Sequence, residues 1–318
     1  MSLRILFCHR PGGAFGYITD GMINALRDRG HVVDRWDGEE RSWHAFQPDI
    51  YCGASGHKQP IPMHHSAKIA IHVNSYGPVA MEGLNEPEKD ISWVLQQRPN
   101  VVFGYGHEED RLLWSYWTTK HGIPWVPMPT AGDRMVFKQT APVAERERDV
   151  VYLGGRWPYK AQTIDTYLLP LFKKGLKTKL HGWGDWPKGV CAGPLGDDRA
   201  SDFINLGKVG PCISERHTHT HGIDLPERAF KVALCGTLVV HDAAMSVRRM
   251  IPSAVVATTP QQFHDYVVHF CKPEHQDERV ELVARQQREV LSAHTYHHRM
   301  ATLLAALGLA EESEGMLS

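Results

Sequence analysis

The segment from residue 221 to residue 242 constrains the fold more than any other part of the chain. Its sequence is HGIDLPERAFKVALCGTLVVHD, and it predicts a short apolar helix that begins near Pro226 and ends at Gly236. Proline is tolerated at the first helical position, and glycine accepts the backbone conformation that ends a helix. An apolar strand, Thr237 to His241, follows directly. A loop, a helix and a strand in this order are typical of an α/β domain that binds nucleotides.

The same alternation of strands and helices recurs along the chain. In the N-terminal half, strands are predicted at residues 4–8, 31–35, 49–53, 68–73, 101–105 and around 125, with helices at 17–29 and 108–121. In the C-terminal half, strands are predicted at residues 149–153, 177–181, 208–213, 237–241 and 254–257, with helices at 161–174 and 273–307. The last helix has a predicted buried stripe of Val280, Leu282, Val283, Val290 and Leu291. Such a series predicts parallel sheets with helices on both faces.

Two βαβ series in one chain predict two domains. A chain of 318 residues is long for a single hydrophobic core. Residues 127–148, rich in proline and mixed charge, separate the two series and indicate a linker. We therefore expect an α/β protein with two Rossmann-like βαβ domains, over residues 1–140 and 149–293, that face a cleft.

Composition excludes some classes of protein and favours a cytoplasmic one. The 35 basic and 36 acidic residues give a net charge of −1, so no global charge favours nucleic acid or an anionic membrane as partner. The six cysteines form no C-x-x-C pair and are expected to be reduced thiols. No apolar run is long enough for a signal peptide or a membrane helix.

Residues 228–242, RAFKVALCGTLVVHD, resemble the R-x-F-E-A-x-A-x-G-x-x-x-x-x-D motif of glycosyltransferases with the GT-B fold. The segment 294–299, HTYHHR, is similar to the end of the CgeB-like, spore-maturation type of these enzymes. The resemblance implies an acceptor-side N-terminal domain, a nucleotide-sugar site against residues 221–242, and a C-terminal helix over 294–318 that crosses back to the first domain. In one departure, Lys231 stands where the family has glutamate.

Glycine-rich loops after the first strand of each half are candidates for donor binding, because ligands of parallel sheets bind at the carboxyl ends of the strands. Gly12, Gly13 and Gly16 would let backbone amides approach a phosphate or a sugar hydroxyl. In the second half Gly155 precedes Arg156 and Lys160, and the resemblance implies that this cationic pair holds a diphosphate. The alternatives are a turn that binds nothing and cations that cap a surface helix.

Two further segments are candidates for contact with the donor. The turn HGWGDW at 181–186 resembles a Y-G-x-G-W turn that borders the nucleotide base in the family, so Gly182, Trp183 and Trp186 are candidates; the tryptophans could equally cover the edge of the core. The second segment contributes His221, Gly222, Asp224, Arg228 and Lys231. Because a lysine cannot accept hydrogen bonds from ribose hydroxyls, ribose is bound elsewhere, or Lys231 binds phosphate, or the donor differs from the family norm.

A catalytic base is expected in the N-terminal domain, because that domain presents the acceptor in the family. The candidates are His72, Asp20, His107 and Glu108. A histidine with its ordinary pKa of about 6.5 can take a proton from a hydroxyl at neutral pH. A core histidine bonded to a backbone carbonyl is the alternative for each histidine. His217, His219 and His221 alternate along the chain, but no further ligand completes a set, so we expect no metal site there and no metal requirement.

These features predict a cytoplasmic glycosyltransferase, or one of the host cytoplasm if a phage encodes it. It would move a sugar from a nucleoside diphosphate donor, a UDP sugar, to a hydroxyl on a small molecule, a protein or envelope component, or a modified DNA base, without a further cofactor. The low net charge counts against DNA. Two alternatives stay open: a nucleotide-sugar epimerase of the same fold, and a non-catalytic module that binds a nucleotide or a metal.

Overall fold

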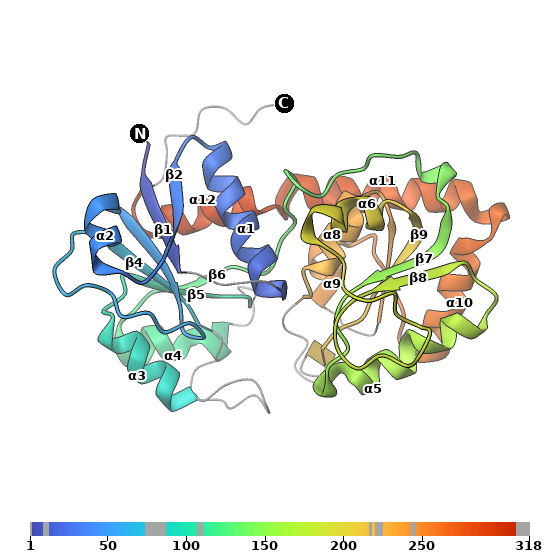
Figure 1. The fold of residues 1–318 in the computed structure, drawn as a ribbon. Helices are drawn as coiled ribbons and strands as arrows, with labels where there is room; N and C mark the ends of the chain where they lie inside the picture. Colours follow the sequence, from blue (N-terminus) through green and yellow to red (C-terminus); the bar gives the residue numbers. More distant parts are fainter. Residues whose placement is uncertain are drawn as a thin grey trace. The chain divides into compact units, whose positions relative to one another are not determined.

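The chain folds into two units, each built on one parallel sheet (Figure 1). The computed structural model describes residues 2–8, 13–73, 87–106, 111–215, 218–219, 225–242 and 246–309. Unit 1 comprises Met1–Pro129 and Tyr296–Ser318, and unit 2 comprises Thr130–Thr295. The predicted α/β class with two Rossmann-like domains is confirmed.

Unit 1 has a six-stranded sheet in the order β2-β1-β3-β4-β5-β6. Its strands are β1 (Arg4–Cys8), β2 (Val32–Trp36), β3 (Ile50–Ala54), β4 (Lys68–His72), β5 (Val101–Gly104) and β6 (Trp125–Pro127). The apolar runs of the inner strands β1, β3, β4 and β5 are buried, as expected for a parallel sheet covered on both faces. The chain leaves β1 toward β2 on one side and returns to β3 on the other, so the strand order reverses at β1.

The helices of unit 1 cover both faces of its sheet. In Figure 1, α1 (Gly13–Asp28) and α12 (Tyr296–Ala306) lie on one side, and α3 (Pro87–Gln96) and α4 (Arg111–His121) lie on the other. The remaining helix is α2 (Glu40–Phe46). As predicted, a glycine follows the end of α1: Gly30 has a φ of 84°. The helix begins at Gly13 rather than at Tyr17, so Gly13 and Gly16 are helical and do not form the predicted loop.

Helix α12 packs closely on α1 because α1 has a glycine at the crossing. A Cβ atom on Gly21 would lie 2.2 Å from Cδ2 of Tyr296, whose ring is buried. The next residue of α12 is His297, whose Nε2 lies 2.8 Å from Oδ2 of Asp28. Arg299 Nε donates to the carbonyl of Pro129 over 2.7 Å. These contacts attach the C-terminal helix to unit 1.

Unit 2 has a five-stranded sheet in the order β11-β10-β9-β7-β8. Its strands are β7 (Arg148–Leu153), β8 (Thr178–His181), β9 (Gly207–Cys212), β10 (Leu238–His241) and β11 (Val255–Val256). In Figure 1, α5 (Pro158–Tyr167) and α10 (Pro260–Cys271) lie on one face, and α6 (Ala200–Ile204), α8 (Arg228–Leu234) and α11 (Gln276–Ala293) on the other. Short elements complete the unit: η2 (Val143–Glu145), η3 (Leu169–Lys173), η4 (Asp197–Arg199), α9 (Ser246–Met250) and η5 (Pro273–His275).

The segment that was predicted to be a linker packs on unit 2 along much of its length. Arg146 is buried and donates to the carbonyls of Asn205, Cys235 and Gly236. The hydroxyl of Thr130 donates to the carbonyl of Leu225. A proline-rich composition therefore marks an irregular segment here, but one that is bonded to the unit through Thr130 and Arg146.

The buried face of α11 differs from the predicted stripe. Val280 and Leu291 are 37% and 44% exposed, whereas Val283 and Val290 are buried as predicted. Two polar residues complete the buried face: Arg279, whose Nη1 donates to the carbonyl of Phe270, and Gln286. The Gln286 side chain accepts a hydrogen bond of 2.9 Å from the backbone amide of Val239 in β10. Partners for these polar groups make their burial tolerable, which an apolar pattern cannot anticipate.

The six cysteines are free thiols, as predicted. Among the residues that the structure describes, we find no helix with the length and apolar character needed to cross a bilayer.

Candidate active site

Charged side chains gather at the carboxyl edge of the sheet in unit 2. The strand order reverses between β7 and β9, and ligands of open parallel sheets bind outside the carboxyl ends at such a point. Five charged or titratable residues lie on the elements that leave this edge: Lys160 in α5, Glu215 and His219 after β9, Arg228 in α8, and Asp242 after β10.

Glu215 and Lys160 form an ion pair that uses only one of the two carboxylate oxygens. Lys160 Nζ lies 2.7 Å from Oε1 of Glu215, and the lysine is only 3% exposed. The second carboxylate oxygen, Oε2, is buried and has no hydrogen-bond partner in the described part of the chain. The buried hydroxyl of Thr218 also has none there. Because a buried polar atom without a partner costs about 1–3 kcal/mol, such atoms mark a position where a ligand can bind.

Asp242 is a wholly buried carboxylate that organises the ends of β9 and β10. Its carboxylate accepts hydrogen bonds from the backbone amide (2.7 Å) and the hydroxyl (2.8 Å) of Ser214. It also accepts from Nε2 of His219 (3.0 Å) and pairs with Nδ1 of His241 (2.9 Å). Burial alone would raise the pKa of Asp242, but the hydrogen bonds from the two histidines hold this pKa below its ordinary value. The hydrogen bond between His219 and Asp242 also raises the pKa of His219. An ionised Asp242 therefore favours a protonated His219.

An open hollow of about 190 Å³ adjoins His219 on the α5 side. It is lined by Gln162, Thr163, Thr166, Tyr167 and His219. The ring of Tyr167 stacks on that of His219, with centroids 6.2 Å apart. The histidine thus connects the buried carboxylate to a polar surface depression.

Arg228 spans the ends of β7 and β9. Its Nε donates to the carbonyl of Leu153 over 2.9 Å, and its Nη1 to that of Ile213 over 3.3 Å. The guanidinium carbon lies 4.4 Å from the centre of the Tyr152 ring. Burial raises the pKa of the Cys212 thiol to about 12, while the charges of Arg228, Asp242 and Lys160 also act on it. These three charges therefore converge at the end of β9.

The glycines of the two loops after β7 and β8 are required by packing. A Cβ atom on Gly155 would lie 2.3 Å from the Trp183 ring, and one on Gly182 would lie 1.8 Å from the carbonyl oxygen of Gly154. A Cβ on Gly154 itself would meet Nη2 of Arg228 at 2.2 Å. The two loops are thus locked together and against Arg228.

The two tryptophans of the second loop have different environments. Trp183 covers Gly155 and is 56% exposed, so its outer face is open to a stacking partner. Trp186 packs against the hydrophobic core of unit 2, with its ring edge-on to that of Tyr152 at 6.1 Å. The structure therefore leaves Trp183 as the candidate for stacking.

Both members of the predicted cationic pair have carboxylate partners in the structure. Arg156 makes two hydrogen bonds to the carboxylate of Asp165, at 3.0 and 2.7 Å, and a third to the carbonyl of Asp185. Lys160 pairs with Glu215 as described above. Arg156 thereby fixes its own loop to α5 and to the neighbouring loop.

Lys231 also has a carboxylate partner. Its Nζ lies 2.8 Å from Oε2 of Glu227, four residues earlier in the chain. Burial lowers the pKa of Lys231, and the ion pair opposes that effect. Among the four candidate cations, Arg228 alone has hydrogen bonds only to carbonyl oxygens within the described chain. Of these four positive charges, that of Arg228 is the one that no carboxylate of the described residues pairs with.

In unit 1, His72 lies at the carboxyl end of β4. It lines a cavity of about 20 Å³, together with residues from β1, β3, β5 and α1. This volume accommodates roughly one water molecule. The His72 ring lies 4.2 Å from that of Tyr105, and Tyr105 stacks on Phe15 at 6.4 Å. Phe15 is 43% exposed, so an aromatic surface leads from solvent toward His72.

Asp20 is separate from His72. Its carboxylate pairs with Arg35 in β2, which is the edge strand on the other side of β1. Three strand spacings, about 14 Å in total, separate β2 from β4. The other predicted site residues, Gly12, His107, Glu108, His221, Gly222 and Asp224, lie outside the described residues. Of the alternating histidines, His219 is described, and it has helical rather than extended geometry.

A family model described as glycosyl transferase-like matches residues 141–305, slightly more than half of the chain. The chain belongs to the glycosyl transferase-like family. The prediction of a glycosyltransferase is thereby confirmed. No curated protein sequence matches the chain significantly.

Solved structures with a similar fold span nearly the whole length of this glycosyl transferase-like chain. T4 phage β-glucosyltransferase in complex with UDP and Mn²⁺ has a TM-score of 0.60 at 11% identity, covering 95% of this chain and 99% of its own. Sucrose-phosphate synthase from Thermosynechococcus elongatus has a TM-score of 0.67 at 10% identity, with coverage of 96% and 98%. The trehalose 6-phosphate synthase of Burkholderia multivorans has a TM-score of 0.59 at 10% identity, with coverage of 97% and 98%. The GT-B fold is thereby confirmed.

The region matched by the glycosyl transferase-like model contains every charged residue of the carboxyl edge in unit 2. Sequence reasoning identified Lys160 and Arg228 there but did not select Glu215, Thr218 or Asp242 as site residues. Asp242 ends the motif itself, and an acid at the end of a buried strand was the signal available for it. For Glu215 and Thr218, the only signal in the sequence was their position after the strand that forms β9.

Proposed function

We propose that this glycosyltransferase binds a nucleoside diphosphate sugar at the carboxyl edge of unit 2 and transfers the sugar to a hydroxyl. The observation that carries this proposal is a pair of buried atoms, Glu215 Oε2 and Thr218 Oγ1, that have no partner among the described residues, together with the ammonium of Lys160 on the other oxygen of Glu215. A carboxylate oxygen accepts hydrogen bonds from sugar or ribose hydroxyls, which a lysine at the position of the family glutamate cannot do. Glu215 thus takes over the role for which Lys231 is unsuited.

In this proposal Arg228 is the main contact for the diphosphate. Within the described chain no carboxylate pairs with Arg228, and its bonds to the carbonyls of Leu153 and Ile213 hold it across the carboxyl ends of β7 and β9, where ligands of such sheets bind. Negative charge accumulates on the diphosphate as the sugar leaves, so a fixed cation there stabilises the transition state. Lys160 contributes a second positive charge close by. Arg156 holds the loop of Gly155 in place, and Trp183 offers its exposed face to the base.

The identity of the nucleotide is proposed to be uridine diphosphate. The structure of T4 β-glucosyltransferase with a similar fold holds UDP, and uridine diphosphoglucose is described as its substrate. No further cofactor and no divalent metal are part of the proposal. The motifs at 228–242 and 294–299 support placing the chain with the CgeB-like enzymes of the family.

We propose the carboxyl edge of unit 1 as the acceptor side. His72 would act as the base through the single water that its cavity admits, because a base can take a proton directly or through one water. Phe15 presents an exposed ring at which an acceptor can stack. A small hydroxylated molecule, a protein or envelope component, and a modified DNA base remain the acceptor classes; the net charge of −1 ranks DNA last.

The test is a panel of nucleotide sugars measured for thermal stabilisation and slow donor hydrolysis. A ligand that binds only the folded state stabilises it by an amount that grows with its concentration, so a UDP sugar at millimolar concentration should raise the melting temperature. Glu215→Gln should weaken binding of the UDP sugar, because the amide has one acceptor oxygen fewer and no charge for Lys160. If no nucleotide sugar shifts the wild-type melting temperature, donor binding at this edge is refuted.

A further inference from the structure

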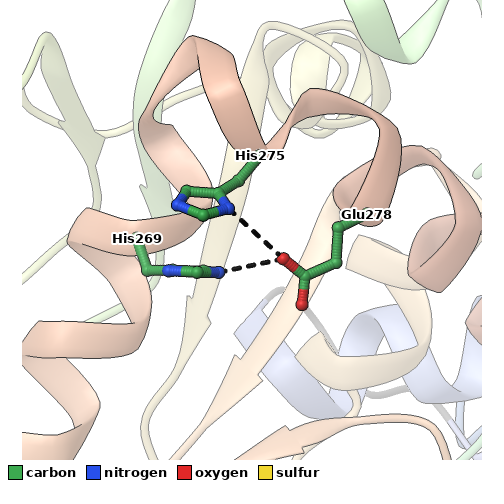
Figure 2. A group of neighbouring side chains, drawn as sticks. All are labelled: His269, His275 and Glu278. Carbon is green, nitrogen blue, oxygen red and sulfur yellow. Dashed lines mark hydrogen bonds and ion pairs between the residues drawn. The ribbon is translucent and has the colours of Figure 1, made fainter.

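Two histidines and a glutamate meet at the junction of α10, η5 and α11 in unit 2. His269 lies in the last turn of α10, His275 in η5 and Glu278 in the first turn of α11. Figure 2 shows both imidazole rings pointing a nitrogen at the same carboxylate oxygen. Nε2 of His269 lies 2.9 Å from Oε2 of Glu278, and Nδ1 of His275 lies 3.5 Å from it. Among the described residues this is the one group of three such side chains whose ligand atoms lie within 4.8 Å of one another.

The two imidazole rings are stacked on each other. Their centroids are 3.5 Å apart with an angle of 27° between the planes. Stacked imidazoles that each carried a proton on both nitrogens would repel each other at this distance. A cation between the two nitrogens and the carboxylate would instead accept three lone pairs at once.

The donor atoms and their spacing fit a divalent transition-metal ion. Imidazole nitrogen and carboxylate oxygen are common ligands of Zn²⁺, with bonds of about 2.0–2.2 Å. Tetrahedral bonds of that length place neighbouring ligand atoms about 3.3 Å apart. The two N···O separations of 2.9 and 3.5 Å lie on either side of this value. Because the rings are stacked, they must also rotate for both in-plane lone pairs to reach a shared ion.

The backbone that carries these side chains is held by a buried network. Arg279, next to Glu278, is 1% exposed and donates to the carbonyl of Phe270, next to His269. The amide of His275 donates to the carbonyl of Lys272 over 3.3 Å. Ligands on positions fixed in this way lose little conformational entropy when a metal binds.

The group lies far from the proposed donor site. The neighbouring Cys271 contacts the carbonyl of Asp149 through its Sγ, and its own carbonyl accepts from Lys208. Asp149 and Lys208 are near the amino ends of β7 and β9, whereas the donor site is at the carboxyl ends. A metal at the junction would therefore connect α10 to α11 and would not contact the reacting groups.

We propose that His269, His275 and Glu278 form a binding site for a divalent transition-metal ion such as Zn²⁺, with a water molecule in the fourth position. The site stabilises the junction of α10 and α11. Its ligands follow the spacing His-x₅-His-x₂-Glu, which the sequence alone does not distinguish from chance in a chain with 20 histidines. This inference is independent of the proposed donor site.

The test uses the full chain, freed of metal with a chelator that is then removed, and titrated with ZnCl₂ by calorimetry. His269→Gln and Glu278→Gln each remove one metal ligand at a surface position. Each should raise the zinc dissociation constant by at least about tenfold. His44→Gln is the matched control, because His44 is an exposed histidine paired with Glu40 in unit 1, and no described residue offers a third ligand there. It should bind zinc as the wild type does. Zinc should also raise the melting temperature of the wild type and the control, but not of the two site variants.

The melting temperature of each variant without metal checks that it folds. The proposal is overturned if the wild type binds no zinc, or if the site variants and the control bind it with the same stoichiometry and affinity as the wild type. Stabilisation by a UDP sugar, measured in the presence of the chelator, is expected to be the same in all four proteins, so failure of the metal site leaves the donor proposal untouched.

Discussion

Nε2 of His219 lies 3.0 Å from Oδ2 of Asp242, a carboxylate that is completely buried at the end of β10. The aspartate also receives the amide and the hydroxyl of Ser214, so it fixes the chain after β9 to the chain after β10. Glu215 directly follows Ser214. The geometry of the proposed hydroxyl-binding carboxylate therefore depends on a buried charge that does not itself contact the donor.

This pair predicts a pH dependence of stability. Because Asp242 raises the pKa of His219, protonated His219 stabilises the fold fully below its unfolded pKa of about 6.5. This stabilisation is lost as the pH rises through the higher pKa of the folded state, by about 1.4 kcal/mol for each unit of difference. Urea unfolding from pH 5.5 to 9 should show this loss in the wild type, and His219→Asn should lack it.

Asp242 has the opposite dependence, because its pKa is lowered in the folded state. Its stabilisation is present above the unfolded pKa of about 3.9 and is lost at lower pH. Within the window from pH 5.5 to 9 its contribution stays constant, so the part of the slope that His219→Asn removes belongs to His219. Equal slopes for the wild type and His219→Asn would contradict the assignment.

A second prediction separates the two arginines of the donor edge. Arg228→Gln should raise the dissociation constant for a UDP sugar about 10-fold to 100-fold, since hydrogen bonds to charged groups contribute about 1.5–3 kcal/mol. Arg156→Gln should have a smaller effect on affinity and a larger one on the unliganded melting temperature, because Arg156 joins its loop to Asp165 and Asp185. Calorimetric titration and thermal melts of both variants measure these quantities.

Glutamine places its amide nitrogen where the arginine Nε lies, so it can still donate to Leu153 from position 228 and to Asp165 from position 156. Each variant therefore serves as the control for the other. The result that would contradict the assignment is an affinity loss at position 156 that equals or exceeds the loss at position 228. In that case Arg156 must exchange Asp165 for phosphate when the donor binds.

The sequence predicts the strands well because burial on both faces requires continuous apolar runs. Residues 4–8 form β1 with the predicted bounds, and β10 begins one residue after the predicted start. The start of α1 was missed because Gly13 and Gly16 suggest a loop, yet both are helical. The buried face of α11 was misjudged because Arg279 and Gln286 belong to it, each with backbone partners that only the tertiary structure supplies.

The candidate site was predictable in position but not in its charge pairing. The motif and the strand ends indicated the correct edge of the sheet. The pair of Lys231 with Glu227 could have been inferred, because residues four apart face each other on a helix. The pairs of Arg156 with Asp165 and of Lys160 with Glu215 connect different elements, and their geometry is set by how α5 packs on the sheet. The order of charged residues along the sequence does not predict how α5 packs, and therefore does not predict these two ion pairs.

The third prediction concerns the contact that attaches the C-terminal helix to α1. Gly21→Ala places a methyl group 2.2 Å from Cδ2 of Tyr296, so the ring or the helix must move. Overpacking of a buried contact costs about 1–3 kcal/mol. This cost opposes the gain of up to about 1 kcal/mol that alanine brings over glycine inside a helix. We expect a net loss of stability in urea unfolding, with faster amide exchange in α12.

A double variant tests whether the ring is the cause. Tyr296→Leu alone should destabilise unit 1, because a buried aromatic ring is lost. In the Tyr296→Leu background, however, Gly21→Ala should be neutral or stabilising, because the smaller side chain leaves space for the methyl group. The two substitutions should therefore be non-additive, as expected for residues in direct contact. Additive effects would show that α12 docks on α1 without depending on the glycine at their crossing.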